Sequence, residues 1–297
     1  MIPPRRRFLA QAAVFSAVAF FRRIGAARPG APVSDEEIFR AVLRDATESR
    51  WAARPIGEVV ALMGQRFLAA PYVAHTLEAE GPERLIVNLR EFDCTTFIES
   101  MLSLARCVKM STASIADFES QLRLIRYRSG KIDGYASRLH YFTDWIADNA
   151  RKGIVADLSR ELGGAPRSFR IAFMSEHPDS YRQLGDPAAL AAIRSSEREL
   201  TAVQRWYIPR SRVQEIQGRL RSGDLVGITT SADGLDIAHT GMVVVRSGRP
   251  VFLHASQSGK QVELADGTLA SYIQRYRTHD GIMVARPREP ELKERPR

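Results

Sequence analysis

Cys94 begins a predicted helix, at a position where a thiol could act as a nucleophile. The residues that follow it repeat at the spacing of one buried α-helical stripe, as Phe97, Met101, Leu104, Ala105 and Val108. Asp93 is predicted to cap this helix by accepting from the free N–H groups of its first turn. The positive end of the helix dipole favours the thiolate, which is the form of cysteine that attacks carbonyl carbons. The alternative is a small buried hydrophobic residue, as free cysteines often are.

Two histidines lie on neighbouring predicted strands near the C-terminal end of the chain. If Val245 faces Pro250 across the turn between these strands, His254 lies opposite Gly241. His239 is then one diagonal step away on the same face of the sheet. A cysteine at a helix start and two imidazoles on one strand pair could serve as nucleophile, base and orienting group.

Cys107 is the only other cysteine, and it falls in the same predicted helix. At ~1.5 Å of rise per residue, Cys94 and Cys107 lie about 20 Å apart along the helix axis. A disulfide requires Cα atoms within roughly 7 Å, so the two cysteines cannot form one in this helix. The N-terminal sequence, described below, predicts an exported protein, and an exported protein that keeps an unpaired thiol usually has a function for that thiol.

The elements that must position these residues change in type along the chain. A capping box at Ser34 and Glu37 predicts a first helix that ends near Ser49, and a second helix follows Pro55. Residues 112–210 are predicted to be mostly helices and loops. Strands are predicted later in the chain, at residues 224–229, 239–245, 251–254 and 281–285. Helices followed by a sheet indicate an α+β domain without alternating βαβ units.

Residues 1–27 have the pattern of a twin-arginine export signal. Arg5-Arg6-Arg7-Phe8-Leu9 is followed by an apolar run of fourteen residues, too short for a membrane-spanning helix of roughly 20 residues. Gly25-Ala26-Ala27 supplies small residues for cleavage. The chain is therefore expected to be exported to the periplasm without stable membrane insertion. Arg22 and Arg23 after the apolar run leave a retained anchor as the alternative.

The positive charge depends strongly on this signal. The formal net charge is +9, and removal of residues 1–27 takes away five arginines and no acids, which leaves 38 − 34 = +4. A mildly cationic chain is compatible with an anionic polymer such as the cell wall. No basic module with interleaved aromatic residues is present, so nucleic acid is not an expected partner.

Four motifs, in this order, resemble the papain-like NlpC-type cell-wall cysteine hydrolases: Phe92-Asp93-Cys94, Gly223-Asp224-Leu225-Val226, His239-Thr240-Gly241-Met242-Val243-Val244 and Leu253-His254-Ala255-Ser256. Residues 93–99, 140–145 and 281–287 are similar, more narrowly, to the N-acetylmuramoyl-L-alanine amidase-like branch. The resemblance spans residues 56–287. It implies a cysteine that begins a helix packed on a mainly antiparallel sheet. A single catalytic domain is expected at residues 28–286, and the tail at 287–297, rich in charge and proline, is expected to be disordered.

The resemblance implies Cys94 as nucleophile, His239 as base and His254 as the orienting residue. The activity implied is hydrolysis of the N-acetylmuramoyl–L-alanine amide bond of peptidoglycan or its fragments, through a thioester and without a metal or cofactor. Residues 112–210 are expected to form an insertion that selects the substrate. The substrate-binding candidates within it are His140, Tyr141, Asp144 and Trp145. Their alternative interpretation is a helix with a core stripe and a solvated Asp144.

The sequence is also compatible with other activities. The same cysteine and histidines could cut within the stem peptide as an endopeptidase, or transfer the acyl group to an amine as an acyltransferase. A metal site of His239, His254 and Asp236 is disfavoured because the tight ligand pairs typical of zinc are missing. A non-catalytic wall-binding module is disfavoured by the intact cysteine and histidines.

Overall fold

The computed structural model describes residues 33–291, and residues 34–291 belong to one compact unit. The expected export signal at 1–27 lies outside the described residues, as does the end of the chain from residue 292. Across the described residues, no helix combines the length and the apolar character needed to cross a membrane.

Within residues 33–291, eight strands form one sheet in which every pairing is antiparallel. The strand order is β2-β3-β8-β4-β5-β6-β7, and β1 pairs with β8. The strands are β1 (Val155–Asp157), β2 (Ala165–Ser168), β3 (Gln204–Pro209), β4 (Leu225–Thr230), β5 (Ile237–Arg246), β6 (Arg249–Ser256), β7 (Gln261–Leu264) and β8 (His279–Pro287).

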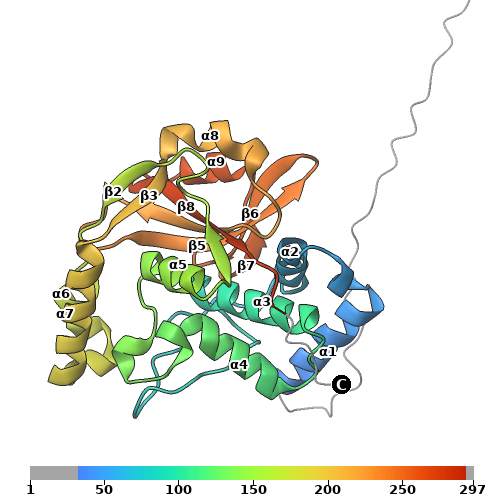
Figure 1. The fold of residues 1–297 in the computed structure, drawn as a ribbon, viewed down its shortest axis with the longest axis horizontal. Helices are drawn as coiled ribbons and strands as arrows, with labels where there is room; N and C mark the ends of the chain where they lie inside the picture. Colours follow the sequence, from blue (N-terminus) through green and yellow to red (C-terminus); the bar gives the residue numbers. More distant parts are fainter. Residues whose placement is uncertain (1–32, 292–297) are drawn as a thin grey trace, which may run out of the picture. The chain divides into compact units, whose positions relative to one another are not determined.

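Helices lie on both faces of this sheet (Figure 1). On one side α2, α3 and α5 lie against the strands, and α1 and α4 pack on α3 further out; α8 and α9 lie on the other side. The helices are α1 (Asp35–Glu48), α2 (Ile56–Arg66), α3 (Cys94–Lys109), α4 (Ile115–Arg126), α5 (Phe142–Arg151), α6 (Phe173–Glu176), α7 (Pro187–Thr201), α8 (Val213–Ile216) and α9 (Leu269–Ile273).

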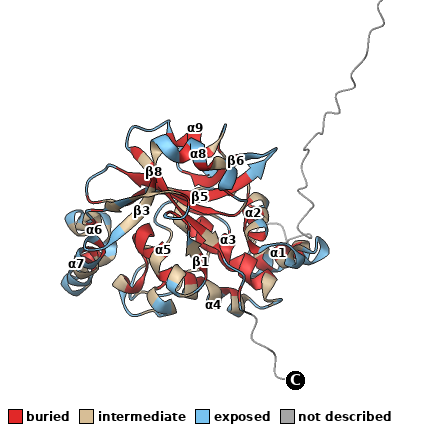
Figure 2. Ribbon diagram, turned by 45° about the horizontal axis from the view of Figure 1, so that its top comes forward, coloured by how far each residue is buried: buried red, intermediate tan, exposed pale blue. Residues whose placement is uncertain are grey.

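Two hydrophobic cores, one on each face, result from the alternation of side chains along the central strands. Met242 and Val244 of β5 belong to the core with α2 and α3, whereas Val243 belongs to the core with α8 and α9. Strands buried on both faces need apolar residues at nearly every position. Figure 2 shows this as buried central strands between the helices.

The local signals at the helix starts are confirmed. The capping box of Ser34 and Glu37 is present at the start of α1, and α2 begins directly after Pro55. The α3 helix begins at Cys94, and the Asp93 side chain caps it. Short-range hydrogen bonds determine these boundaries, which explains why the sequence predicts them well.

The predicted register of the β5–β6 hairpin is also confirmed. Val245 pairs with Pro250, and Met242 pairs with Leu253, so His254 lies opposite Gly241. The two-residue turn is Ser247-Gly248, with φ of 48° and 74°. Two positive φ values match the twist that a tight hairpin requires.

Two expectations about the middle and the end of the chain need correction. Residues 112–210 contain β1, β2 and β3 in addition to helices and loops. The expected tail at 287–297 begins too early, because β8 continues through Pro287. Beyond it, Glu289 accepts from the Ile56 N–H at 2.7 Å and lies 3.1 Å from Lys109 Nζ. A charged segment is ordered here because its carboxylate has two partners.

Candidate active site

Cys94 is the first residue of α3 and is held there by a reciprocal cap. Asp93 Oδ1 accepts from the N–H groups of Thr95 at 2.9 Å and of Thr96 at 2.7 Å. The Thr96 hydroxyl in turn accepts from the Asp93 N–H at 2.9 Å. Most of α3 beyond this turn is buried, whereas Cys94 keeps part of its surface exposed. Cys94 therefore lies at the less buried end of a rigid helix, with its thiol directed into a desolvated cavity.

The two histidines, His239 on β5 and His254 on β6, form a hydrogen-bonded pair. His239 Nε2 lies 2.8 Å from His254 Nδ1, and the two rings are perpendicular with centroids 4.8 Å apart. Phe252 stacks on His254 at 4.9 Å, and the Tyr272 ring lies 5.0 Å from it. His254 is only 2% exposed, so this packing leaves it little freedom to move. The pair is arranged so that His254 can orient His239.

Cys94 and His239 line the same cavity, which has a volume of about 140 Å³. Its walls are the start of α3, residues 140–142 at the start of α5, α6 and residues 235–240 around the start of β5. No hydrogen bond joins the two side chains in the described structure; the Thr95 hydroxyl lies 4.0 Å from Cys94 Sγ. Such contacts are often loose before substrate binds and tighten in the reactive complex.

Burial keeps both partners neutral at rest. It is the largest cause that raises the pKa of the Cys94 thiol, with the Asp93 carboxylate second. Burial also lowers the pKa of His239 to about 3 and that of His254 to about 4. The helix dipole at the start of α3 favours the thiolate, as the sequence predicts, but burial of the thiol acts in the opposite direction.

The structure brings two of the four substrate-binding candidates to this cavity. His140 and Tyr141 both line it. His140 Nε2 lies 2.9 Å from the Tyr135 carbonyl oxygen, and burial lowers the pKa of His140 to about 3. The Tyr141 hydroxyl donates to Glu197 Oε1 at 2.6 Å, so it is already engaged on the side away from solvent.

Asp144 and Trp145 do not line the cavity. Asp144 is buried and accepts two hydrogen bonds from Arg128, at 3.1 and 2.8 Å. Trp145 is fully buried and stacks on Phe142 with centroids 5.0 Å apart. Both residues therefore belong to the packing of α5, as in the core-stripe alternative, although Asp144 is ion-paired instead of solvated.

Two residues near the thiol carry no signal in the sequence. Tyr72 pairs through its backbone with Phe92, two residues before Cys94, and burial is the largest cause that raises its pKa to about 12. Tyr272 packs against the histidine pair from α9. Neither belongs to α3, β5 or β6, which begin with or contain Cys94, His239 and His254, and only the tertiary fold brings them to the site.

Asp236, the third member of the disfavoured metal site, is directed elsewhere. Its carboxylate accepts from the N–H groups of Thr143 at 2.8 Å and Ile237 at 2.7 Å. Among residues 33–291, no group of three His, Cys, Asp or Glu side chains is placed to hold a metal ion. Asp236 therefore connects the start of α5 to the start of β5, the two segments that carry His140 and His239.

The antiparallel sheet and its covering helices are shared with solved structures named as N-acetylmuramoyl-L-alanine amidases, a class of hydrolases. An N-acetylmuramoyl-L-alanine amidase from Bacteroides uniformis ATCC 8492 is 35% identical over 78% of this chain and 99% of that chain, with a TM-score of 0.75. A Bacteroides fragilis protein assigned provisionally as a xylanase is 34% identical over 76% of this chain and 99% of that chain, with a TM-score of 0.72.

The family is shown by the sequence itself. The AmiA-like family, described as N-acetylmuramoyl-L-alanine amidase-like, matches residues 62–283, and the chain belongs to this family. A Legionella pneumophila protein that is 19% identical shares the fold, with a TM-score of 0.64 over 86% of this chain and 95% of that chain. No curated protein matches. The predicted resemblance to the amidase-like branch is thus confirmed at the level of the family.

Proposed function

We propose that this protein is a cysteine amidase of the papain-like NlpC type, which hydrolyses the N-acetylmuramoyl–L-alanine bond of peptidoglycan or its fragments. The observation that carries the proposal is the shared cavity of Cys94 and His239, with His254 hydrogen-bonded to His239. The choice of bond follows from the family and from the Bacteroides uniformis relative. An exported, periplasmic location, as the N-terminal sequence predicts, is where such a substrate is found.

The first chemical step is the attack of the thiol on the amide carbonyl. Because thiol and imidazole are both neutral at rest, Cys94 transfers its proton to His239 as the sulfur–carbon bond forms. His239 Nε2 faces His254 Nδ1, so Nδ1 is the nitrogen of His239 left to accept this proton. In the corresponding tautomer His239 Nε2–H donates to His254 Nδ1, and this bond stabilises the imidazolium that forms.

The negative charge on the carbonyl oxygen needs donors near the start of α3. Asp93 accepts from Thr95 and Thr96 but not from Cys94, which leaves the Cys94 N–H for the oxyanion. The Tyr72 hydroxyl is the second donor in this proposal, since the Tyr72 backbone pairs with Phe92, two residues before Cys94. When the intermediate collapses, the carbon–nitrogen bond breaks and His239 protonates the leaving amine. Water then hydrolyses the thioester and restores the thiol.

Digestion of purified muropeptides by the full chain, followed by mass spectrometry, tests this function. We expect free stem peptides that begin with L-alanine, together with the matching muramic acid product. Cys94→Ala should reduce their formation by more than about 10³-fold, as loss of a nucleophile does in other acyl-transfer enzymes. Cuts within the stem peptide would instead identify an endopeptidase, and a new amide product an acyltransferase. Unchanged activity in Cys94→Ala would exclude all three.

A further inference from the structure

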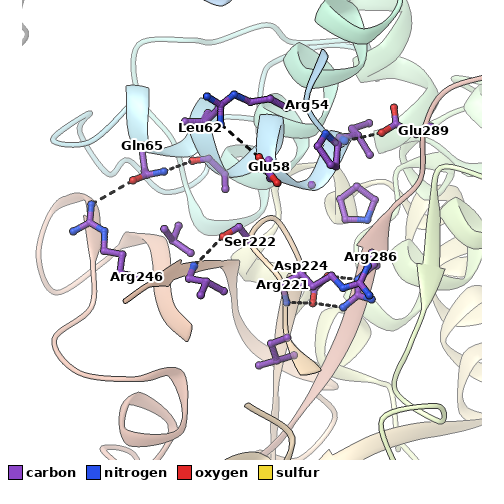
Figure 3. Close-up of a pocket in the computed structure, with 18 residues that line it drawn as sticks. Arg54, Glu58, Leu62, Gln65, Arg221, Ser222, Asp224, Arg246, Arg286 and Glu289 are labelled. Atoms are coloured by element: carbon purple, nitrogen blue, oxygen red, sulfur yellow. Dashed lines mark hydrogen bonds and ion pairs between the residues drawn. The ribbon is translucent and has the colours of Figure 1, made fainter. Parts of the chain in front are cut away.

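A second and larger cavity, drawn in Figure 3, is lined by the end of β5, whereas the start of β5 lines the catalytic cavity. Its volume is about 670 Å³, within the range of small-ligand sites. It is lined by one face of α2 and the two residues before it, by the turn before β4, by the end of β5 and by the end of β8 with Glu289 beyond it. The residues are Arg54, Pro55, Ile56, Gly57, Glu58, Ala61, Leu62, Gln65, Leu220, Arg221, Ser222, Asp224, Val244, Val245, Arg246, Arg286, Pro287 and Glu289. The start of β5 lines the catalytic cavity, so the ten-residue length of this strand separates the two.

The walls of this second cavity are fixed by direct backbone contact between α2 and the turn before β4. Gly223 has φ of +85°, and a Cβ on it would lie 1.9 Å from the Gly57 carbonyl oxygen. On the neighbouring wall, the Val245 N–H donates to the Ser222 hydroxyl at 2.9 Å. These contacts leave the walls no room to shift, so the cavity is formed before any ligand arrives.

Each of the three carboxylates that line this cavity already has a partner within the protein. Asp224 accepts from Arg286 Nε at 2.7 Å and from its Nη2 at 2.8 Å. Glu289 has the Ile56 N–H and Lys109, as described above. Glu58 lies 3.6 Å from Arg54. The acidic side of the cavity therefore has little attraction left for a cation.

Two arginines of the lining lack such a carboxylate partner among the described residues: Arg221 and Arg246. Both are exposed, and Arg246 contacts only the neutral Gln65 side chain, at 3.3 Å. Counting the lining residues, four arginines minus three acids gives +1, and Lys109 beside Glu289 makes +2. Leu62, Val244 and Val245 add apolar surface between these charges.

We propose that this cavity binds the carboxylate-bearing stem peptides of peptidoglycan, as an accessory site separate from the catalytic cavity. This inference rests on the proposed function, which supplies the polymer. A guanidinium binds a carboxylate through two parallel hydrogen bonds, and the apolar surface suits the short side chains of a peptide. A polymer held at two sites stays near the catalytic cavity at a high effective concentration, which strengthens binding to intact wall over single fragments.

Co-sedimentation with purified peptidoglycan tests the accessory site, with Cys94→Ala as the parent protein so that the polymer is not cut. We expect Arg221→Gln/Arg246→Gln to weaken binding by about tenfold at low salt, and less at high salt because screening weakens the charge interaction. The matched control is Arg44→Gln/Arg123→Gln, which removes the same charge from exposed positions on α1 and α4. This control should bind like the parent.

Two further binding measurements complete this test. Arg246→Glu reverses a charge at an exposed position and should weaken binding more than Arg246→Gln, with an unchanged melting temperature. Peptidoglycan whose carboxylates have been converted to amides should bind the parent and the double variant equally weakly. Equal binding of parent and double variant to untreated peptidoglycan would overturn the accessory site, as would a parent that does not bind it at all.

The two proposals can fail separately. Muropeptide digestion by the protein with Cys94 intact decides the amidase function. If no muropeptide is cut but sedimentation still depends on Arg221 and Arg246, the amidase proposal is wrong and the accessory site stands. If muropeptides are cut at the expected bond and the double variant sediments like the parent, the accessory site is wrong and the amidase stands.

Discussion

At the scale of single residues, the protonation state of Cys94 follows from a comparison of magnitudes. A helix dipole contributes about 0.3–1 kcal/mol to a charge at its N-terminus, which is less than one pKa unit of about 1.4 kcal/mol. Burial and the Asp93 carboxylate act in the opposite direction and are the larger causes of the raised pKa of the thiol. His239 has no carboxylate partner that would raise its pKa; burial, His254 and His279 all lower it. A resting thiolate–imidazolium pair is therefore not favoured.

The pH dependence of alkylation measures this directly. Because the pKa of Cys94 lies above its ordinary value, the thiolate fraction should rise about tenfold per pH unit from pH 6 to pH 8, without a plateau. The measurement is the rate of iodoacetamide labelling at Cys94, followed by mass spectrometry. Cys107 is the internal control: it is buried, its pKa is raised to about 11, and it should label more slowly throughout. A rate that levels off below pH 7 would indicate an ion pair.

At the scale of elements, α5 has two roles along its length. Its start lines the catalytic cavity, and Asp236 fastens that start to β5 through the Thr143 N–H. Directly after Thr143, in the same first turn, the side chains of Asp144 and Trp145 point away from the cavity, to Arg128 and to the core. Residues that line the cavity at the start of this helix should therefore affect substrate binding, whereas Asp144 and Trp145 should affect stability.

Two substitutions separate these roles. Asp144→Asn removes the charge that pairs with Arg128 and should lower the free energy of unfolding by about 1–3 kcal/mol, with KM unchanged. His140→Ala removes a side chain from the cavity wall and should raise KM instead. Urea unfolding and steady-state kinetics on a soluble muropeptide provide the two measurements. A raised KM with unchanged stability in Asp144→Asn would return that residue to the substrate wall.

Sequence alone predicts the elements that depend on local signals. The caps of α1 and α3 and the turn of the β5–β6 hairpin involve residues at most a few positions apart, and their patterns are visible in the chain. The strands β1 and β3 pair with β8, which lies far away in sequence, and β2 pairs with β3. Short strands with polar residues, such as Ala165–Ser168, have no apolar alternation to reveal them.

At the scale of the whole molecule, the site depends on contacts that no local pattern contains. The hairpin register places His239 near His254, and the packing of α3 on β5 brings Cys94 to the same cavity. For α5, helical spacing identifies which residues share a side, but not which side faces the cavity. That is why His140 and Tyr141 reach the site while Asp144 and Trp145 do not. The raised pKa of the thiol likewise cannot be predicted from the sequence, because it depends on how deeply the folded chain buries Cys94.

The buried histidine pair should also make the stability of the whole molecule sensitive to acid. In the unfolded chain both imidazoles bind protons below pH 6.5, whereas in the folded protein their pKa values are about 3 and about 4. The unfolded state thus binds more protons between these limits, and stability present above pH 6.5 is lost as the pH falls. Glu99 and Asp236 act in the opposite direction, because burial raises their pKa. Comparison with the double variant His239→Asn/His254→Asn isolates the contribution of these two imidazoles to the pH dependence of the free energy of unfolding.

Between pH 6.5 and pH 5, the wild-type protein should lose about 3 kcal/mol more unfolding free energy than this double variant, as measured by urea unfolding at each pH. The variant lacks the two groups whose protonation favours the unfolded chain, while its carboxylates remain the same. An equal loss in both proteins would mean that the folded state protonates the histidines as readily as the unfolded chain does. A neutral His239 would then no longer be available as the base at pH 5, and the proton transfer from Cys94 proposed above would require a different acceptor.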